Sequence, residues 1–236
     1  MNDILENGRD YFLPNLSIDL VIIGYEDGVL KCLLLKLGPK WALPGGYIKK
    51  DESVDHAVVR ILKERTGLAR PHFKFLSVFG AADRRFDQEF KNYFDANGLP
   101  WRDDYWINDR FVTLSHYSLV DIAHTKPEPG EFDEAVAWFP FDQLPDLWLD
   151  HGSIIDFARN RLKEDSKNEL HTHNLLPSAF TMPELHRLHQ TILDENLDRS
   201  RFQKKILATG RFERLPKLKK ESPGSNPYQY RLKNRS

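Results

Sequence analysis

Apolar and polar residues alternate in blocks along the first third of the chain. Two apolar runs, at residues 17–25 and 30–35, are separated by Glu26, Asp27 and Gly28. Short apolar runs bounded by turn residues are typical of buried strands, and an Asp-Gly pair favours the tight turn of a hairpin. We therefore expect the fold to begin with a β-hairpin.

A helical pattern follows a glycine-containing loop at residues 41–49. The acids and the hydroxyl of residues 51–53 suit the start of a helix, and Gly67 suits its end. Between them apolar residues recur at helical spacing, at Val54, Ala57, Val58, Ile61 and Leu62. The order expected so far is strand, strand, loop, helix.

The middle of the chain predicts three more strands and a second helix. The strands are expected at residues 73–79, 111–120 and 135–139. Residues 84–110 are polar and aromatic without a clear period, so we interpret them as an insertion. Apolar positions at residues 154–162 indicate a helix that ends near Lys163, and the charged residues 164–175 are interpreted as a linker. This gives a first domain at residues 1–163.

The C-terminal segment, residues 176–236, begins with a strong helix signal. Thr181 and Glu184 form a capping-box sequence, and Pro183 lies at the first helical position. Apolar residues then recur on one face, at Leu185, Leu188, Ile192 and Leu193.

A second C-terminal helix is expected at residues 199–209, where Asp198 suits its start and Gly210 its end. Two short strands are expected after it, at residues 211–215 and 228–232. Helix, turn, helix and a two-stranded wing is the order of a winged helix-turn-helix domain.

Composition excludes several classes of protein. The chain has 236 residues, of which 40% are hydrophobic, enough for two domains with a core each. No apolar run approaches the ~20 residues that span a bilayer, and the N-terminus lacks the apolar core of a signal peptide. The single cysteine, Cys32, cannot form an internal disulfide, which fits a reducing compartment. We expect a cytoplasmic protein without a membrane partner.

Charge is divided unevenly between the two parts. Residues 176–236 carry 13 Lys and Arg against 6 Asp and Glu, a net charge of +7. Because the whole chain has a net charge of −1, the first 175 residues carry −8. A basic segment on an acidic body favours binding to the phosphate backbone of nucleic acid, although basic tails also occur as ordinary solvated surface.

The chain contains one long spaced motif. Gly46 is followed by Glu52 six residues later and by Arg60 eight residues after that, and Glu64 and Gly67 complete the pattern. On these residues the segment resembles the Nudix box. The resemblance implies an α+β fold, a Nudix-type α/β/α sandwich with a mixed sheet, in which glutamates of one helix hold divalent cations at a diphosphate.

The motif departs from the Nudix pattern at two positions. Ile61 and Arg65 stand where the family has metal-binding glutamates, so that Glu64 alone remains of that set. Magnesium prefers an oxygen shell of carboxylates and phosphates, which neither side chain provides. We therefore expect no bound metal, no cofactor and no catalysis. The alternative, an active hydrolase of a nucleotide sugar or ADP-ribose, is supported by Glu52 and Glu64, and Glu64 is equally explained as a surface carboxylate.

The second C-terminal helix offers a polar face for reading DNA. Phe202 and Ile206 fall on its apolar side, whereas Ser200, Arg201 and Lys204 fall on the other. Arginine suits guanine edges in the major groove, and lysines of a wing suit phosphates. The candidate DNA-binding residues are Ser200, Arg201, Lys204, Lys205, Arg211, Lys217, Lys219 and Lys220. The alternative is a solvated basic face on an interaction domain that binds no DNA.

Over nearly its whole length the chain resembles the Nudix-related transcriptional regulators. The C-terminal resemblance is carried by residues 174–177, 180–185, 198–202 and 228–232. It implies a ligand-responsive regulator, a repressor of a sugar-utilisation or NAD-metabolism operon, that binds a double-stranded DNA operator as a homodimer. The implied effector is a pentose sugar or an ADP-ribose-like molecule. Residues 49–55 resemble the sugar branch, which we favour at this point, while residues 86–109 are longer than the usual connection in the family.

Candidate effector-binding residues are polar or aromatic side chains near the expected sheet. Asp19 is a lone acid in an apolar strand and needs a partner, either a ligand hydroxyl or a fixed hydrogen bond. Tyr47 suits stacking on a sugar or base, and core packing explains it equally. Arginine suits a phosphate and aspartate a sugar hydroxyl. The full set is Asp19, Lys36, Trp41, Gly46, Tyr47, Asp83 and Arg84.

Overall fold

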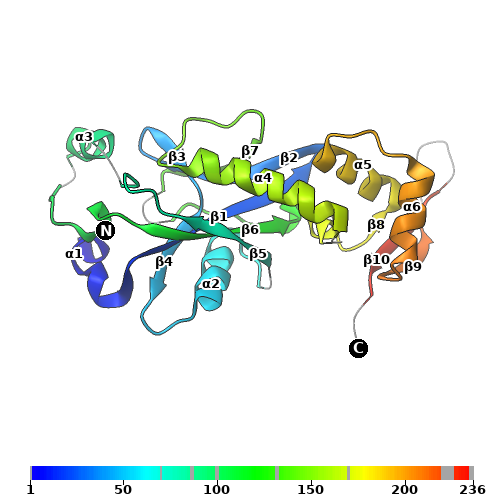
Figure 1. Cartoon of the computed structure of the whole chain (residues 1–236), viewed down its shortest axis with the longest axis horizontal. Helices are drawn as coiled ribbons and strands as arrows, with labels where there is room; N and C mark the ends of the chain where they lie inside the picture. The colour runs from blue at the N-terminus through cyan, green and yellow to red at the C-terminus, as the bar shows by residue number, and fades with distance from the viewer. Residues whose placement is uncertain are drawn as a thin grey trace.

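A larger sheet domain and a smaller helical domain follow one another along the long axis of the molecule in the computed structural model (Figure 1). The structure describes residues 2–69, 71–85, 88–98, 101–130, 133–168, 171–218 and 226–233. Its α-helices are α1 (Asn2–Tyr11), α2 (Val54–Thr66), α3 (Gln88–Ala96), α4 (His151–Asn168), α5 (Met182–Leu193) and α6 (Arg199–Ala208). Short 3₁₀ helices are η1 (Trp106–Asn108), η2 (Ile122–His124) and η3 (Thr172–Leu175).

Seven strands of the described residues form one mixed sheet. They are β1 (Phe12–Glu26), β2 (Val29–Leu37), β3 (Lys40–Ala42), β4 (Gly45–Lys49), β5 (His72–Phe79), β6 (Val112–Val120) and β7 (Ala135–Pro140). The main path is β3-β2-β1-β6-β5, with β4 paired to β1 and β7 paired to β2. β1 and β6 run parallel, whereas the pairs β1–β2 and β5–β6 are antiparallel.

The expected hairpin is the pair β1 and β2. Asp27 and Gly28 connect the two strands and have positive φ angles of 53° and 84°. Two consecutive left-handed residues make a turn whose twist matches that of the flanking strands. The Asp-Gly signal in the sequence is therefore confirmed.

Both faces of the sheet are buried. Successive side chains of β1 point to opposite faces, so this strand contributes to two separate cores. Ile18 and Ile22 belong to one core with Ile61 of α2, whereas Val21 and Ile23 belong to another core with residues of α4. Helices α2 and α4 accordingly lie on opposite faces of the sheet (Figure 1). The expected α/β/α sandwich with a mixed sheet is confirmed.

Helix α2 begins and ends at the residues that the sequence indicated. The Ser53 side chain accepts a hydrogen bond from the His56 backbone N–H, which satisfies one free donor of the first turn. At the other end Gly67 adopts a left-handed φ of 73°, and its N–H donates to the Lys63 carbonyl. Local capping thus fixes the position of the helix that carries the Nudix-like motif.

The C-terminal domain is a winged helix. The capping box of Thr181 and Glu184 is present at the start of α5, and Asp198 caps α6 by accepting from the Arg201 backbone N–H. The wing strands β9 (Phe212–Lys217) and β10 (Tyr228–Leu232) pair antiparallel, and β8 (Phe180–Thr181) adds a third strand to this sheet. The expected order of elements is confirmed, with β8 as the addition.

Four segments differ from the sequence-based expectation. Helix α4 does not end near Lys163 but continues to Asn168, so the first part of the expected linker is helical. Residues 84–110 contain α3 and η1, and the expected loop at residues 41–49 contains β3 and β4. Helix α1 was not expected. Lys219 and Lys220 lie outside the described residues.

The glycines of β4 explain why the sequence predicts a loop in that segment. Gly45 and Gly46 pair with Asp19 and Ile18 of β1. A Cβ on Gly45 would lie 2.6 Å from the Ile18 carbonyl oxygen, and one on Gly46 would lie 3.0 Å from Ile61 Cδ1. Glycine in this strand therefore serves close approach of the backbone rather than flexibility.

The two domains share a continuous core. Leu30 and Cys32 of β2 belong to the same hydrophobic cluster as Leu188 and Ile192 of α5. The Thr191 hydroxyl lies 3.2 Å from the Gly28 carbonyl of the first hairpin and 3.1 Å from the Arg187 carbonyl of its own helix, and it shares its one proton between them. Within the described residues, no helix combines the length and apolar character required to cross a membrane.

Candidate functional site: an apolar cavity and an exposed basic helix

The sheet domain contains a cavity of about 240 Å³ between the sheet and the segments that precede and follow it. Its wall is mainly apolar, with a small number of charged side chains. The lining side chains that bear on function are Asp19, Tyr47, Arg65, Arg84, Arg85, Phe94, Phe111, Asp133 and His151. An apolar cavity with a few convergent polar groups is the usual form of a small-molecule site.

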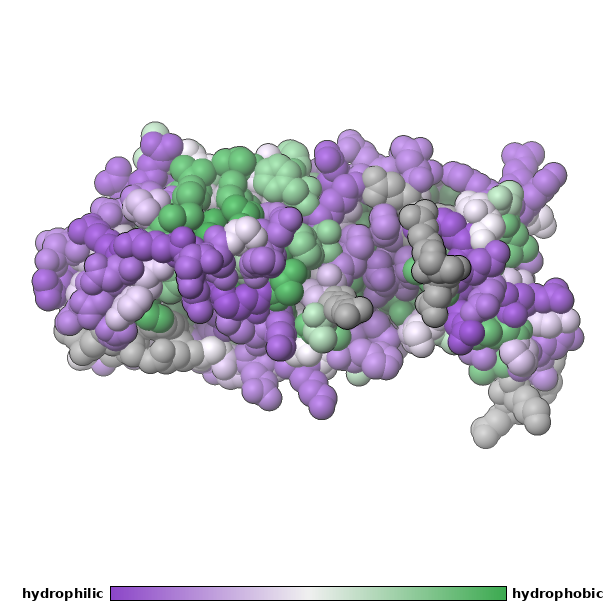
Figure 2. Space-filling view, turned by 90° about the horizontal axis from the view of Figure 1, so that it is seen from below, coloured by the Kyte–Doolittle hydropathy of each residue, from purple (hydrophilic) through white to green (hydrophobic). Residues whose placement is uncertain are grey.

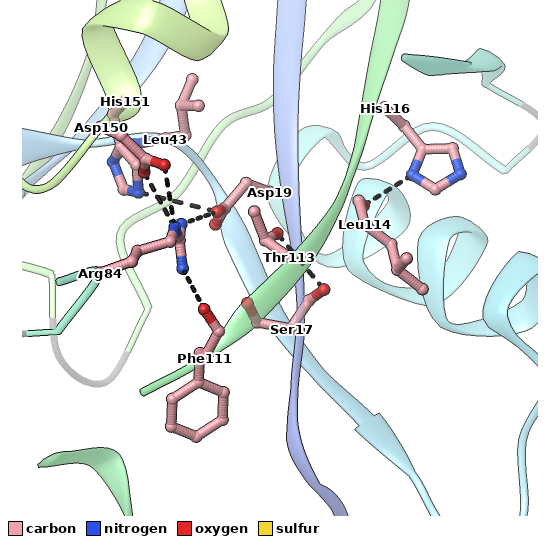
Figure 3. Close-up of polar contacts among 10 residues, drawn as sticks. All are labelled: Ser17, Asp19, Leu43, Arg84, Phe111, Thr113, Leu114, His116, Asp150 and His151. Atoms are coloured by element: carbon pink, nitrogen blue, oxygen red, sulfur yellow. Dashed lines mark hydrogen bonds and ion pairs between the residues drawn. The ribbon is translucent and has the colours of Figure 1, made fainter. Parts of the chain in front are cut away.

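A buried ion network forms one side of this cavity (Figure 3). Arg84 Nη2 donates to Asp19 Oδ2 at 2.6 Å, and Arg84 Nε donates to Asp150 Oδ1 at 2.9 Å. Arg84 Nη1 reaches the Phe111 carbonyl oxygen at 3.5 Å. The Arg84 side chain is only 4% exposed, so its charge depends on these two carboxylates for compensation.

His151 completes the network as a neutral ring. The Leu43 backbone N–H donates to its Nδ1 at 3.0 Å, which leaves the hydrogen on Nε2, 3.8 Å from Asp19 Oδ2. Burial is the main reason that the pKa of His151 lies below its usual value, and it outweighs the charge of Asp19, which acts to raise that pKa. His151 is also the first residue of α4, so the cavity lies directly at the start of that helix.

Aromatic rings form another part of the cavity wall, next to the ion network. The ring of Tyr47 lies 4.5 Å from that of Trp106 and 5.4 Å from that of Phe111, measured between centroids. Trp106 Nε1 donates to the Ile4 carbonyl of α1 at 2.6 Å. Burial raises the pKa of Tyr47 to about 12, so its phenol stays protonated. Helix α1 and the insertion together therefore roof the cavity.

The residues of the Nudix-like helix do not fit a divalent cation. Ile61 is buried in the core beneath Gly46, and the Arg65 guanidinium donates to Asp133 Oδ2 at 2.6 Å. Glu64 is exposed and pairs with Arg60 at 3.5 Å instead of facing the cavity. The part of the chain that the structure describes contains no group of three or more acidic, His or Cys side chains able to hold a metal ion.

The Glu52–Arg60 pair of the motif holds a loop in place. Glu52 Oε2 accepts from Arg60 Nε at 3.0 Å, and its Oε1 accepts from the Lys49 N–H at 2.8 Å. Arg60 also donates to the Tyr47 carbonyl at 2.9 Å. The hydrogen bond from Arg60 is the main reason that the pKa of Glu52 is lowered. The pair thus positions β4, which contributes Tyr47 to the cavity.

Four of the seven candidate effector residues line the cavity, namely Asp19, Gly46, Tyr47 and Arg84. Lys36 and Trp41 do not, because Lys36 Nζ donates to the Pro39 carbonyl and Trp41 packs edge-on against Phe139. Asp83 lines a neighbouring hollow on the other side of Arg84. Sequence reasoning missed Asp150, His151 and Phe94, whose role depends on contacts far along the chain.

The exposed face of α6 carries the candidate base-reading residues. Ser200, Arg201 and Lys204 are exposed there, whereas Ile206 is buried and Phe202 half-buried. Lys205 differs from its neighbours, because its Nζ donates to the Lys167 carbonyl at the end of α4 at 3.0 Å. Figure 2 shows that the surface of this end of the molecule is mainly hydrophilic on the face in view.

The wing carries further cations. The Arg214 guanidinium lies 4.2 Å from the centre of the Tyr228 ring, and Lys217 Nζ lies 5.2 Å from it. Lys217 is exposed, whereas Arg211, the residue before β9, is half-buried. Lys217 is therefore the described wing lysine best placed to contact a phosphate.

Comparison with known families fits this division into two parts. The family model of the NUDIX domain matches residues 17–157, and the model of the NrtR DNA-binding winged helix domain matches residues 172–232. The chain belongs to the Nudix-related transcriptional regulators.

Individual relatives of this regulator support both parts. It is 26% identical over 219 residues to the ADPR responsive transcriptional repressor NtrR of Acinetobacter baylyi, covering 89% of this chain and 79% of that protein. It is 27% identical over 159 residues to the ADP-ribose pyrophosphatase of Methanocaldococcus jannaschii, covering 66% and 79%. The crystal structure of Shewanella oneidensis NrtR complexed with a 27mer DNA has a TM-score of 0.71 and 26% identity, covering 92% and 93% of the two chains.

Proposed function

We propose that this Nudix-related regulator is a ligand-responsive repressor whose sheet domain senses a small molecule and whose winged helix binds a double-stranded operator. The observation that carries the proposal is the pairing of a partly open, mainly apolar cavity with an exposed basic helix in one continuous structure. The repressor from Acinetobacter baylyi, which is described as ADPR responsive, resembles this chain over most of its length.

Helix α4 supplies the physical connection between the two sites. It begins with His151 in the cavity wall, next to Asp150, which binds Arg84. Eighteen residues long, it ends where Lys167 accepts a hydrogen bond from Lys205 of α6. A ligand that shifts the buried network of Arg84 therefore acts on α6, the proposed DNA-reading helix, through the single helix α4.

An ADP-ribose-like effector fits the cavity better than a free pentose. The aromatic rings of Tyr47, Phe94 and Phe111 suit a base or sugar ring, and the guanidinium of Arg65 suits a phosphate. A free pentose offers no charge for Arg65. The controlled operon is proposed to serve NAD metabolism, with sugar utilisation as the alternative.

The sheet domain is proposed to be non-catalytic. Ile61 offers no oxygen to a metal ion, and Arg65 would repel one. We expect no release of AMP from ADP-ribose in the presence of Mg²⁺ or Mn²⁺. Turnover that is lost in Glu64→Gln would contradict this and favour the hydrolase alternative.

A homodimer acting in the cytoplasm completes the proposal. Phe75 and Val78 on the edge strand β5 are 49% and 53% exposed, which leaves apolar surface for a second copy. Light scattering after size exclusion should give twice the 27.6 kDa chain mass. A monomer at micromolar concentration would contradict the dimer.

The sensing function is tested by linkage between ligand and operator. An operator is first selected from a pool of random duplexes, and ADP-ribose and arabinose are then titrated by calorimetry with and without it. An effector must change affinity for the operator by the same factor as the operator changes affinity for the effector. A ligand that binds equally well in both states is not the effector, and the absence of any selected duplex would remove the repressor proposal itself.

A further inference from the structure

The cavity has three described arginines in its wall, and they differ in how many hydrogen-bond donors remain for a ligand. A guanidinium has five N–H donors. Arg84 is bound by Asp19 and Asp150, contacts the Phe111 carbonyl, and is 4% exposed. Each of its three nitrogens already donates within the protein, so Arg84 is part of the wall rather than a ligand-binding group.

Arg65 has a different environment. Its side chain is 20% exposed, and among the described residues its guanidinium donates one hydrogen bond, from Nη1 to Asp133 Oδ2. Its other donors bind no partner among the described residues, and its side chain lines the cavity. Arg85 also lines the cavity and is exposed.

Asp133 fixes the orientation of Arg65. The Asp133 side chain is 8% exposed, and its Oδ2 also accepts from the Gly130 N–H at 2.8 Å. Because the Asp133 carboxylate is itself held by the backbone, it keeps the Arg65 guanidinium in one orientation. Arg65 then loses little side-chain entropy when a ligand binds to it. A planar fork held in this way matches two oxygens of a phosphate.

We propose that Arg65 binds a phosphate group of the effector directly, so that effector binding needs no divalent cation. The inference rests on the proposed function for the identity of the full ligand, but the anion site itself does not. It also gives a reason for an arginine at a position of the motif where the family resemblance implies a metal-binding glutamate.

The test compares three variants of the full chain by calorimetry in EDTA, with ADP-ribose, adenosine and sodium pyrophosphate as probes. Arg65→Gln removes the charge. Arg65→Gln with Asp133→Asn also removes the carboxylate that would otherwise lose its partner, and it guards against misfolding. Lys63→Gln is the matched control, because Lys63 lies on the same helix but is exposed and outside the cavity.

We expect ADP-ribose to bind the wild type equally well in EDTA and in Mg²⁺. Both Arg65 variants should bind it at least about tenfold more weakly, since hydrogen bonds to charged groups contribute that much, while Lys63→Gln should bind as the wild type does. Adenosine, which has no phosphate, should bind all four proteins alike. A requirement for Mg²⁺, or unchanged ADP-ribose affinity in the folded double variant, would overturn the proposal.

Pyrophosphate separates this inference from the proposed function. If ADP-ribose fails to bind the wild type, the effector assignment is wrong. Arg65 is then still an anion site if pyrophosphate binds the wild type and Lys63→Gln but binds the Arg65 variants at least about tenfold more weakly. Equal pyrophosphate affinity in all proteins would exclude Arg65 as an anion site whatever the effector is.

Discussion

The sheet domain and the winged helix differ in the burial of cationic and titratable side chains and in the partners of those side chains. In the sheet domain Arg84 is buried and held between two carboxylates, whereas Arg201 and Lys204 of α6 are exposed. The winged helix buries His189, 3% exposed, beside a hydroxyl instead of an acid. Charged side chains are therefore held by buried partners in one domain and left exposed on α6 in the other, where the proposed function assigns them to DNA binding.

The largest effect on stability is expected from Arg84→Met, at the buried arginine of the sheet domain. It leaves Asp19 and Asp150 without their partner, which costs roughly 3–5 kcal/mol of the free energy of unfolding for a buried pair. Denaturation in urea measures the loss. Arg85→Met removes an exposed arginine next in the chain and should cost less than about 0.5 kcal/mol.

A loss below about 1 kcal/mol in Arg84→Met would show that the network contributes little to stability. Arg84→Met combined with Asp19→Asn should recover part of the loss, because the double variant removes a buried charge left alone by the single one.

The next effect concerns His189 in the core of the winged helix. Burial, with the nearby charge of Lys205, lowers the pKa of His189 to about 4. The unfolded chain binds a proton near pH 6.5, so the unfolded state holds more protons between these two values and stability falls as the pH falls through this window. The loss for this residue is about 3 kcal/mol by pH 4, measured as unfolding free energy against pH.

His189→Gln is the comparison that isolates this effect. A glutamine does not titrate and can still accept a hydrogen bond from Thr172, which lies 2.9 Å from His189 Nε2. Burial also lowers the pKa of His151 and His116, so a shallower dependence of the same sign should remain. Identical pH profiles for variant and wild type would show that His189 is not held neutral by the fold.

Arg201→Ala tests the exposed cations of α6. If Arg201 reads a guanine, it contributes about 1–3 kcal/mol of base discrimination, so the variant should lose affinity for the operator but little for a random duplex. Lys217→Ala should weaken both duplexes alike and make the salt dependence shallower by about one unit. Affinities for both duplexes over a salt series separate the two roles. Equal losses on both duplexes for Arg201→Ala would remove α6 as the base reader.

Local signals account for the part of the fold that the sequence predicted. The Asp27-Gly28 turn, the Ser53 cap and the Thr181 capping box act within a few residues of their own positions. The missed elements depend on distant partners. Trp106 of the insertion binds the Ile4 carbonyl, 102 residues away, and the charged end of α4 stays helical where Asp165 accepts from Tyr117 of β6.

The same holds for the candidate site: features set by local sequence could be predicted, and contacts with distant partners could not. Asp19 stood out as an acid in an apolar strand, which indicated a buried partner without naming it. That partner is Arg84, 65 residues away, and Arg84 in turn binds Asp150, which no local pattern singles out. On α6 the exposed face followed from helical spacing alone, but the contact that separates Lys205 from Lys204 comes from the other domain.

The smallest effect is expected at this last contact, where the two domains meet. Lys205 Nζ donates to the Lys167 carbonyl at the end of α4, where a cation is also favoured by the helix dipole. Lys205→Ala should leave operator affinity nearly unchanged without effector, but lower the coupling free energy between effector and operator by about 0.5–1 kcal/mol. Lys204→Ala, one residue earlier and exposed, should do the reverse: weaker DNA binding with unchanged coupling. Calorimetric titration of effector with and without operator gives the coupling for both. If Lys205→Ala weakens operator binding as Lys204→Ala does and keeps the full coupling, both lysines contact DNA and α4 does not carry the signal through this contact.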